Sequence, residues 1–277
     1  PSFPATASPG LAGLRVSRVA GQSAVTECWA QSPLKLLTPR FRGPSVWAYT
    51  SSFGGGMVAG DQTRLTVDVD DSAVCFLGTQ ASTKVYRNPK FQPCSHHLTA
   101  RIGANASLIL SPDPVQCFAG STYSQRQEFH LSQGAGLVLV DWLSAGRSAR
   151  GERWLFDRFQ SRNEVFRSGR RIFLDSLLLT GKGQQNPVLR RMSRYECLAM
   201  VLIVGMPFAA GAAATLERVD ALPVERRTDF VLSASPVADG TVLRLAGRST
   251  EQVAKEICRT LAFVTPMLKD DPWERKW

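Results

Sequence analysis

The chain has 277 residues, of which 44% are hydrophobic and 20% are charged. This composition excludes an intrinsically disordered chain, and the length allows one large buried core or two smaller ones. The formal net charge of +10 comes mostly from arginine and favours an acidic partner, which can be a protein, a nucleic acid or an anionic lipid surface.

The N-terminal residues, Pro1 to Gly10, are rich in proline and carry no charged side chain. They lack the charged-then-apolar pattern of a secretory signal, and we expect residues 1–12 to form a flexible segment. No two of the six cysteines have C-x-x-C spacing, so a zinc knuckle or a thioredoxin-like motif is not indicated. We therefore expect reduced thiols and a cytoplasmic location.

Short β-strands separated by turn residues are predicted over most of the chain. Leu65, Val67 and Val69 alternate with polar residues, which predicts a half-buried strand that ends at the turn 70–72. The apolar run 73–77 follows at once and is expected to be its hairpin partner. Further apolar runs at 108–110, 137–140 and 172–179 are each bounded by turn or charged residues. This spacing predicts a mainly antiparallel β architecture.

The segment 198–215 carries no charge over nearly the length that a bilayer requires. Gly205 and Pro207 divide it, however, into a short β-rich run and an alanine-rich remainder. We therefore predict a buried strand over 198–204, a turn, and the start of a helix, in preference to a membrane span.

Helices are predicted only toward the C-terminus. Ser249 and Gln252 have capping-box spacing, and apolar residues then recur on one helical face, which predicts a helix over 250–264 that Pro266 ends. A weaker helical pattern covers 212–219. No internal repeat stands out, and we expect residues 1–277 to form a single domain.

The most distinctive local sequence is the glycine turn, residues 54–61, with four glycines in its first seven positions. Glycine permits positive φ and close approach of another chain or a ligand. A phosphate-binding loop requires Lys followed by Ser or Thr after its last glycine, with a helix behind it. Here Asp61 follows and a strand is predicted next, so nucleotide binding is not indicated.

A polar stretch, residues 79–87, follows the apolar strand that ends at Leu77. Most of its side chains can form hydrogen bonds and none is a carboxylate. One interpretation is an exposed edge strand. The other is a recognition strip for a partner, anchored by Lys84, Tyr86 and Arg87, because tyrosine and arginine are frequent in interface hot spots. Sequence alone favours neither.

Together these two motifs resemble the signature of the UreD (UreH) family of urease accessory proteins. The order G-G-x-x-x-G-D, then T-Q-A-x-x-K-x-Y-R, is similar to that family and is carried here by Gly55, Gly56, Gly60, Asp61, Thr79, Gln80, Lys84, Tyr86 and Arg87. Supporting similarities are the P-L-K-L stretch at 33–36, the segment with Tyr123 and Gln125, and the segment with Arg147 and Trp154. Gly78 departs from the family pattern, in which many members have a second threonine.

The resemblance implies a β-rich, two-layer superhelical scaffold with a few short helices toward the C-terminus. It implies a non-catalytic factor that assists nickel insertion into apo-urease, together with a UreF-type helical protein and a UreG-type GTPase that hydrolyses the GTP. It also implies contact with the urease apoprotein, an internal passage for nickel, and no permanently bound cofactor.

Candidate nickel ligands are few, since the chain has only three histidines. Cys94 and His96 are two residues apart and would share one face of a strand. Isolated carboxylates suit a transit passage better than a closed ligand set, and Asp61 and Glu152 lie inside the family-like motifs. Each has a plainer interpretation: Asp61 as the cap of the glycine turn, and Glu152 as the partner of a nearby arginine.

Two other function classes stay open at this point. The stretch 147–171 contains eight arginines interleaved with aromatic residues, which is also compatible with a single-stranded nucleic-acid groove. Its three acidic residues favour a protein-binding or solvated face instead. The second alternative is an unrecognised β-fold hydrolase, although neither G-x-S-x-G nor H-E-x-x-H occurs.

Overall fold

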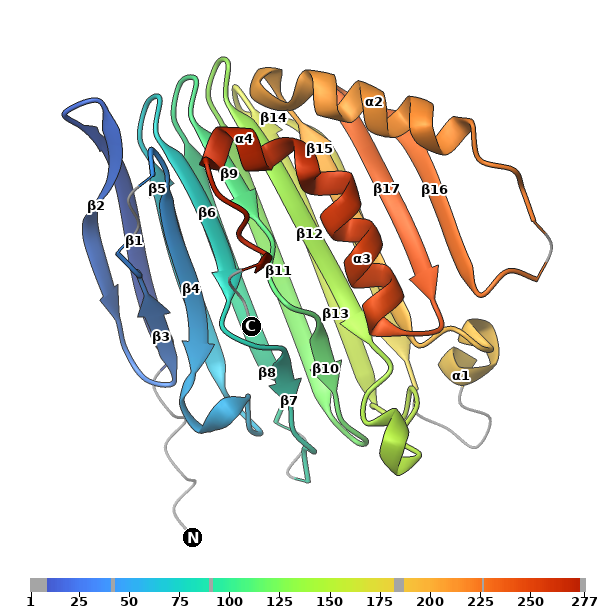
Figure 1. The fold of residues 1–277 in the computed structure, drawn as a ribbon. Helices are drawn as coiled ribbons and strands as arrows, with labels where there is room; N and C mark the ends of the chain where they lie inside the picture. Colours follow the sequence, from blue (N-terminus) through green and yellow to red (C-terminus); the bar gives the residue numbers. More distant parts are fainter. Residues whose placement is uncertain (1–8, 41–42, 90–91, 182–186, 226, 275–277) are drawn as a thin grey trace, which may run out of the picture.

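Two β-sheets stacked face to face make up most of the protein (Figure 1). The structure is a computed structural model that describes residues 9–40, 43–89, 92–181, 187–225 and 227–274. Strands are the predominant secondary structure in this part of the chain, and the longer helices come near its C-terminal end, so the predicted mainly β scaffold is confirmed.

The first sheet contains seven strands among the described residues. In their order across the sheet they are β14 (Arg170–Thr180), β13 (Arg158–Arg167), β11 (Thr122–Leu131), β8 (Cys94–Ile102), β5 (Gln62–Val69), β1 (Gly10–Val19) and β2 (Gln22–Ala30).

The second sheet follows a similar path and extends further at one end. Its strands are, in order, β16 (Phe230–Val237), β17 (Gly240–Gly247), β15 (Cys197–Val204), β12 (Gly136–Ser144), β9 (Ser107–Leu110), β6 (Val74–Thr79), β4 (Val46–Ser52) and β3 (Leu34–Leu37). Two short strands, β7 (Thr83–Val85) and β10 (Val115–Cys117), pair with each other, and β10 also pairs with β12.

Helical segments connect and cover these strands. The α-helices are α1 (Pro187–Met192), α2 (Ala209–Asp220), α3 (Thr250–Leu261) and α4 (Thr265–Leu268), and the 3-10 turns are η1 (Phe53–Gly55), η2 (Ser148–Arg150), η3 (Met206–Phe208) and η4 (Ala262–Val264). Both α2 and α3 pack against β15 and β17 of the second sheet (Figure 1).

The chain winds as a solenoid-like coil, because successive strands alternate between the two sheets. From β5 to β12 each strand of the first sheet is followed by one of the second sheet, so neighbours within a sheet run parallel. Antiparallel pairs occur toward the ends of the stack, as in β1 with β2 and β13 with β14. The predicted mainly antiparallel arrangement is therefore wrong for the middle of the protein.

The predicted hairpin at 65–77 is wrong for the same reason. The turn 70–72 joins β5 of the first sheet to β6 of the second, and the two strands do not pair. The turn bonds instead to the next turn of the coil, where Ser72 N–H donates to the Ala104 carbonyl at 2.8 Å. Asn105 N–H in turn donates to the Gln133 carbonyl at 3.1 Å. Turn residues mark where a strand ends, but they do not specify the sheet in which the next strand lies.

Apolar side chains fill two layers. The first lies between the sheets and includes Leu65, Val67 and Val69, which confirms the predicted alternation along β5. The second lies between the second sheet and the helices and includes Val253, Ile257 and Leu261 of α3. Burial of these two layers is the main stabilising contribution expected of such a fold.

The predicted C-terminal helix is confirmed together with its cap. Ser249 Oγ accepts a hydrogen bond from Gln252 N–H at 3.2 Å at the start of α3, and η4 carries the helical path to Val264. Pro266 does not end this path as predicted, because it occupies the first turn of α4, where a proline requires no N–H partner.

The uncharged segment 198–215 also folds as predicted. It forms the buried strand β15, a turn at Gly205 with φ of 98°, and the beginning of α2. Among the described residues no helix combines the length and apolar character needed to cross a bilayer. Of the expected flexible segment, residues 1–8 lie outside the described residues, whereas Gly10 to Ala12 belong to β1.

We expect truncation of the inter-sheet core to be costly. Phe129 of β11 is fully buried between the sheets, and Phe129→Ala should lower the free energy of unfolding by about 3–5 kcal/mol. Thr66→Ala, on the exposed outer face of the same sheet, should change it by less than about 0.5 kcal/mol. Urea unfolding of both variants tests this, and equal effects would contradict the assignment of the two faces.

Candidate functional site

A row of polar side chains crosses the inner face of the first sheet. The in-register parallel pairing aligns Thr63 of β5 with His96 of β8, then Gln125 of β11 and Ser161 of β13. In-register residues of parallel strands share a face, so these four residues, the inner polar row, all point between the sheets. At the next inward level Leu65 of β5 and Leu98 of β8 are apolar, whereas Gln127 of β11 and Asn163 of β13 are polar, so the polar interior extends further along the last two strands.

Asp141 of β12 meets this row from the second sheet. Its carboxylate accepts hydrogen bonds from Gln125 Nε2 at 2.7 Å, Ser161 Oγ at 2.5 Å and Asn163 Nδ2 at 2.7 Å. The same Gln125 amide also donates to Ser161 Oγ at 2.9 Å. At the other end of the row, Thr63 Oγ1 and His96 Nδ1 are hydrogen-bonded at 2.8 Å. The network thus crosses the interior from one sheet to the other.

Burial changes the protonation of both titratable groups in this network. It raises the pKa of the Asp141 carboxyl, and the hydrogen bonds from Ser161, Asn163 and Gln125 oppose that rise. Burial also lowers the pKa of His96 to about 4, so the imidazole is neutral at physiological pH. A neutral imidazole has a nitrogen lone pair that can bind a transition metal.

A cavity of about 140 Å³ lies between the sheets at this level. Its polar lining includes Thr63, Thr79, His96, Asp113, Gln125 and Asp141. A polar cavity of this size has room for several water molecules. Asp141 and Trp142 also line a second cavity, of about 370 Å³, where Asp175 of β14 pairs with Arg244 of β17 at 2.7 Å. Asp141 therefore forms part of the wall of both cavities.

The glycine turn and the strip 79–87 lie side by side at the rim of the first cavity. Met57 N–H donates to the Lys84 carbonyl at 2.7 Å, and Tyr86 N–H donates to the Met57 carbonyl at 2.9 Å. A Cβ on Gly56 would stand 2.6 Å from the Lys84 carbonyl oxygen, so only glycine allows this approach. Gly55, Thr79 and Thr83 line the cavity directly.

Strip residues differ in what their side chains do. Thr79 Oγ1 is hydrogen-bonded to Asp113 Oδ2 at 2.8 Å inside the cavity, whereas Gln80, Lys84 and Arg87 are exposed. The Tyr86 ring packs edge-on against Phe118, with centroids 5.3 Å apart. The strip is not a free edge strand, because β7 pairs with β10 on one side and bridges to Met57 on the other.

Both carboxylates proposed from the sequence already have structural roles, and neither lines the cavities. Asp61 Oδ2 accepts from Val58 N–H at 2.8 Å and so caps the glycine turn. Glu152 forms a two-pronged ion pair with Arg147, including a 2.9 Å contact from Arg147 Nε, and this hydrogen bonding lowers the pKa of Glu152. The plainer interpretation of each residue is the one that the contacts support.

Cys94 and His96 share the inner face of β8 as predicted, but their surroundings differ. The Cys94 thiol donates to the Val58 carbonyl at 2.9 Å, and burial raises its pKa to about 11, so it is protonated at neutral pH. No cluster of three or more His, Cys, Asp or Glu side chains within the described ranges has a geometry that would hold a metal ion. His96 alone of the pair lines the cavity.

The remaining residues of the family-like motifs are largely internal. Tyr123 is buried and stacks on Phe159 with centroids 6.0 Å apart, and Arg147 covers the Phe118 ring at 4.3 Å. Trp154 is fully buried, and its Nε1–H donates to the Tyr195 carbonyl at 2.9 Å. Trp154 therefore cannot present its ring to a partner.

The basic and aromatic stretch 147–171 does not form a stacking groove. Trp154, Phe156 and Phe159 point into a buried cluster, while Arg158 and Arg162 of β13 point outward. Bases cannot stack on aromatic rings that are buried. This arrangement removes the main observation that favoured single-stranded nucleic acid.

Sequence reasoning missed Asp113 and Asp141, the two carboxylates that line the first cavity. Asp141 left a detectable signal, because it stands alone in the apolar run 136–144. Asp113 lies between two prolines, just after the apolar run 108–110. A lone carboxylate inside an otherwise apolar strand is therefore a candidate functional residue, just as a carboxylate beside glycines is.

Comparison with known proteins gives a consistent result over the whole chain. The family model described as UreD urease accessory protein matches residues 8–277. A urease accessory protein UreD of Anaeromyxobacter sp. (strain Fw109-5) is 44% identical over 96% of this chain and 89% of its own length. One from Sorangium cellulosum (strain So ce56) is 46% identical over 97% of this chain and 84% of its own. Urease accessory protein D of Arabidopsis thaliana is 33% identical over 93% of this chain and 97% of its own.

The raised pKa of Asp141 predicts a pH dependence. Aspartate in the unfolded chain titrates near pH ~4, so above that pH the unfolded state ionises while the folded state still retains the proton. The contribution of Asp141 to the free energy of unfolding therefore falls as the pH rises from about 4 through the higher folded pKa. Asp141→Asn cannot ionise, so rising pH should favour the variant relative to wild type in urea titrations. If wild type instead gains stability relative to Asp141→Asn as the pH rises, the three hydrogen bonds affect the pKa of Asp141 more than burial does.

Proposed function

The chain belongs to the UreD family of urease accessory proteins, and from this premise we propose that it assists the insertion of nickel into the urease apoprotein. In this proposal the chain is a non-catalytic scaffold, active in a complex with a UreF-type protein and a UreG-type GTPase that performs the GTP hydrolysis. Nickel is its transient cargo and it holds no permanent cofactor.

One observation carries this proposal: the polar cavity between the sheets, with Asp141 and His96 in its wall. Interiors of stacked β-sheets are normally filled by apolar side chains, and hydrogen-bonded polar groups persist there at a cost. Here they surround open space, and Asp141 also borders a second cavity. Such an arrangement suits the passage of a hydrated cation from one cavity to the other.

The ligand chemistry supports transit better than storage. Nickel(II) accepts imidazole and carboxylate ligands, and neutral His96 and Asp141 offer one of each. A cation held by four protein ligands would not move on, whereas a few separated ligands permit release. In addition, Asn163 Oδ1 is buried beside Asp141 and has no hydrogen-bond partner among the described residues, so this polar interior is not fully satisfied by the protein itself.

The rim of the cavity supports a link between docking and transfer. Residues of the glycine turn and of the strip 79–87 line the cavity, while Gln80, Lys84 and Arg87 are exposed beside it. A partner that binds this rim would cover the opening. We propose that the UreF-type or UreG-type partner docks here and delivers the ion.

The two alternative functions lack such support. His96 is hydrogen-bonded to Thr63 and not to a carboxylate, so it does not have the arrangement of a hydrolase triad. Trp154, Phe156 and Phe159 of the stretch 147–171 point inward, and the Phe166 ring is stacked on His130. For location, we propose the cytoplasm, with support from six cysteines that all lie among the described residues and form no disulfide. We also propose that the whole chain acts as one domain.

Removing the charge of Asp141 should reduce nickel transfer. Asp141→Asn retains the size of the side chain but replaces an anionic ligand by a neutral amide. In cells that express urease and all accessory subunits, we expect nickel per urease active site to fall by about tenfold, the effect of losing about 1.4 kcal/mol of stabilisation for the ion. Metal analysis of purified urease provides the measurement.

The matched control is Asp220→Asn, which removes the same charge from the exposed end of α2. It should leave nickel loading unchanged. Co-purification should show that both variants assemble like wild type. Full nickel loading with Asp141→Asn would exclude this carboxylate from the route, and equal losses with both variants would indicate a general charge effect.

Substitution of Tyr86 should weaken assembly of the accessory complex, and not only the transfer of nickel. Its ring is partly exposed at the rim, so we expect Tyr86→Ala to weaken co-purification with the accessory partners by about tenfold, a typical loss at an interface hot spot. Tyr86→Phe retains the contact with Phe118 and should bind nearly as well as wild type. Urea unfolding of the two variants separates loss of binding from loss of folding, and intact assembly with well-folded Tyr86→Ala would remove the strip from the interface.

A further inference from the structure

The outer face of the first sheet carries a row of basic side chains directly behind the inner polar row. Arg64 of β5 pairs in register with His97 of β8. His97 pairs with Arg126 of β11, and Arg126 pairs with Arg162 of β13. We call these four residues the basic row. Neighbouring strands are about 4.8 Å apart, so the row spans about 14 Å across four strands.

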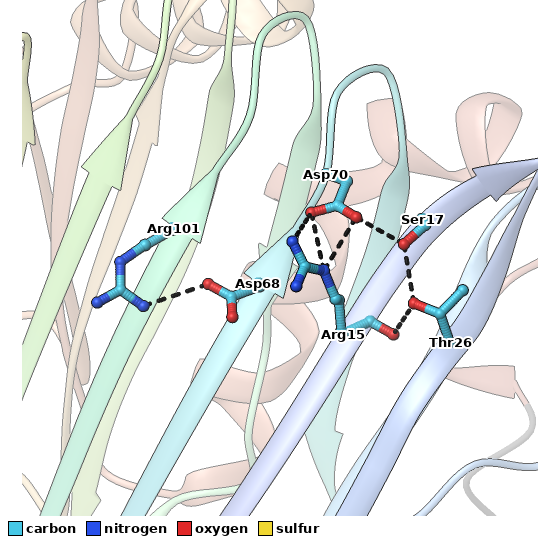
Figure 2. A network of polar contacts seen from close by, with 6 residues as sticks. All are labelled: Arg15, Ser17, Thr26, Asp68, Asp70 and Arg101. Carbon is cyan, nitrogen blue, oxygen red and sulfur yellow. Dashed lines mark hydrogen bonds and ion pairs between the residues drawn. The ribbon is translucent and has the colours of Figure 1, made fainter.

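Arg15 and Arg101, elsewhere on this face, are neutralised by carboxylates. Figure 2 shows that Arg15 points at Asp70 and that Arg101 points at Asp68, with shortest contacts of 3.1 Å and 3.3 Å. Ser17 Oγ also donates to Asp70 at 2.6 Å. Asp68 lies in register with both Arg15 and Arg101, so charges of opposite sign alternate across these strands. Alternation of this kind is the stabilising arrangement for cross-strand pairs.

The basic row is only partly compensated. Arg64 and His97 are exposed, and within the described ranges neither forms an ion pair or hydrogen bond with a carboxylate. Arg126 and Arg162 both contact Glu164, and Arg171 contacts the same carboxylate at 2.9 Å. The hydrogen bond from Arg162 is the largest factor that lowers the pKa of Glu164 to about 2. Glu128 adds a second carboxylate for Arg126 only.

Arg126 and Arg162 face each other on adjacent strands and share the carboxylate of Glu164, and such a pair of like charges is unfavourable in the isolated protein. A docked acidic surface would reverse the sign of this interaction. We propose that the basic row is a docking surface for an acidic patch of the urease apoprotein, an inference that rests on the function proposed above. The cavity rim remains available to the accessory partners, because the basic row faces away from the cavity.

Charge pattern favours a protein over a nucleic acid as the occupant. The next level along the strands carries Thr66, Thr99, Glu128 and Glu164, so carboxylates lie beside the arginines and would repel a continuous polyanion. The nearby Phe166 ring is stacked on His130 with centroids 5.1 Å apart and offers no free platform for a base. A protein surface with interspersed charges matches this pattern.

Introducing carboxylates at Arg64 and His97, the two residues of the row without an acidic partner among the described residues, tests the proposal. The variant Arg64→Glu/His97→Glu is compared with Lys255→Glu/Arg259→Gln on α3, which removes the same formal charge when His97 is counted as neutral. Each full-length chain is purified in its accessory complex, and binding to urease apoprotein is measured at several salt concentrations. Urea unfolding confirms that both variants fold.

We expect the first variant to bind apo-urease about tenfold more weakly and with a flatter salt dependence, because charges across an interface steer and select partners. The α3 variant should bind within about twofold of wild type, as charge changes outside an interface do. Wild-type affinity in the first variant would overturn this docking surface while leaving the proposed function intact. If wild type neither binds apo-urease nor raises its nickel content, the proposed function itself fails. Loss of binding to a fluorescent single-stranded oligonucleotide, with urease binding unchanged, would assign the row to nucleic acid instead.

Discussion

In-register parallel stacking is the constraint on which the rest of this structure depends. Each coil places one strand in each sheet, and hydrogen bonding between coils fixes which residues stand side by side. Because adjacent residues of a strand point to opposite faces, polar or basic residues that occupy the same in-register position on neighbouring strands form a row across one face of the sheet. The inner polar row and the basic row are two faces of the same four dipeptides: Thr63-Arg64, His96-His97, Gln125-Arg126 and Ser161-Arg162.

This arrangement connects the two proposals physically. The basic row lies one layer of sheet away from His96 and Gln125, so the positive charge that Glu128 and Glu164 leave uncompensated would disfavour a cation at those residues. An acidic partner docked on the outer face would reduce this effect. Docking of apo-urease would then favour entry of nickel into the cavity, so that the ion is accepted only when a recipient is present. The exposed rim residues lie on a different part of the surface and leave room for a second partner at the same time.

Local patterns in the sequence predicted the elements well, because they depend on neighbouring residues. The alternation at Leu65, Val67 and Val69, the cap at Ser249 and the Gly205–Pro207 break each specify a strand face, a helix start or a turn without distant contacts. The topology was not predictable in the same way. A turn such as 70–72 bonds to the next coil through Ser72 and Ala104, and nothing in its own residues distinguishes a corner between sheets from a hairpin. Part of the candidate site was predictable. The sequence motifs contain the residues of the cavity rim, and Gln125 and His96, which line the cavity, are among the residues named from the sequence. Asp141 was not predictable in this way, because it lies on a strand of the other sheet and contacts Gln125 only in the folded protein.

The central claim is that nickel passes between the sheets beside Asp141 and His96. Anomalous diffraction at the nickel absorption edge, from crystals of the assembled accessory complex exposed to nickel, tests it most directly. The account predicts an anomalous peak inside the cavity within bonding distance of the Asp141 carboxylate or the His96 imidazole. A cavity without nickel, in crystals whose peaks lie at Asp61, at Glu152 or only on the outer surface, would contradict it.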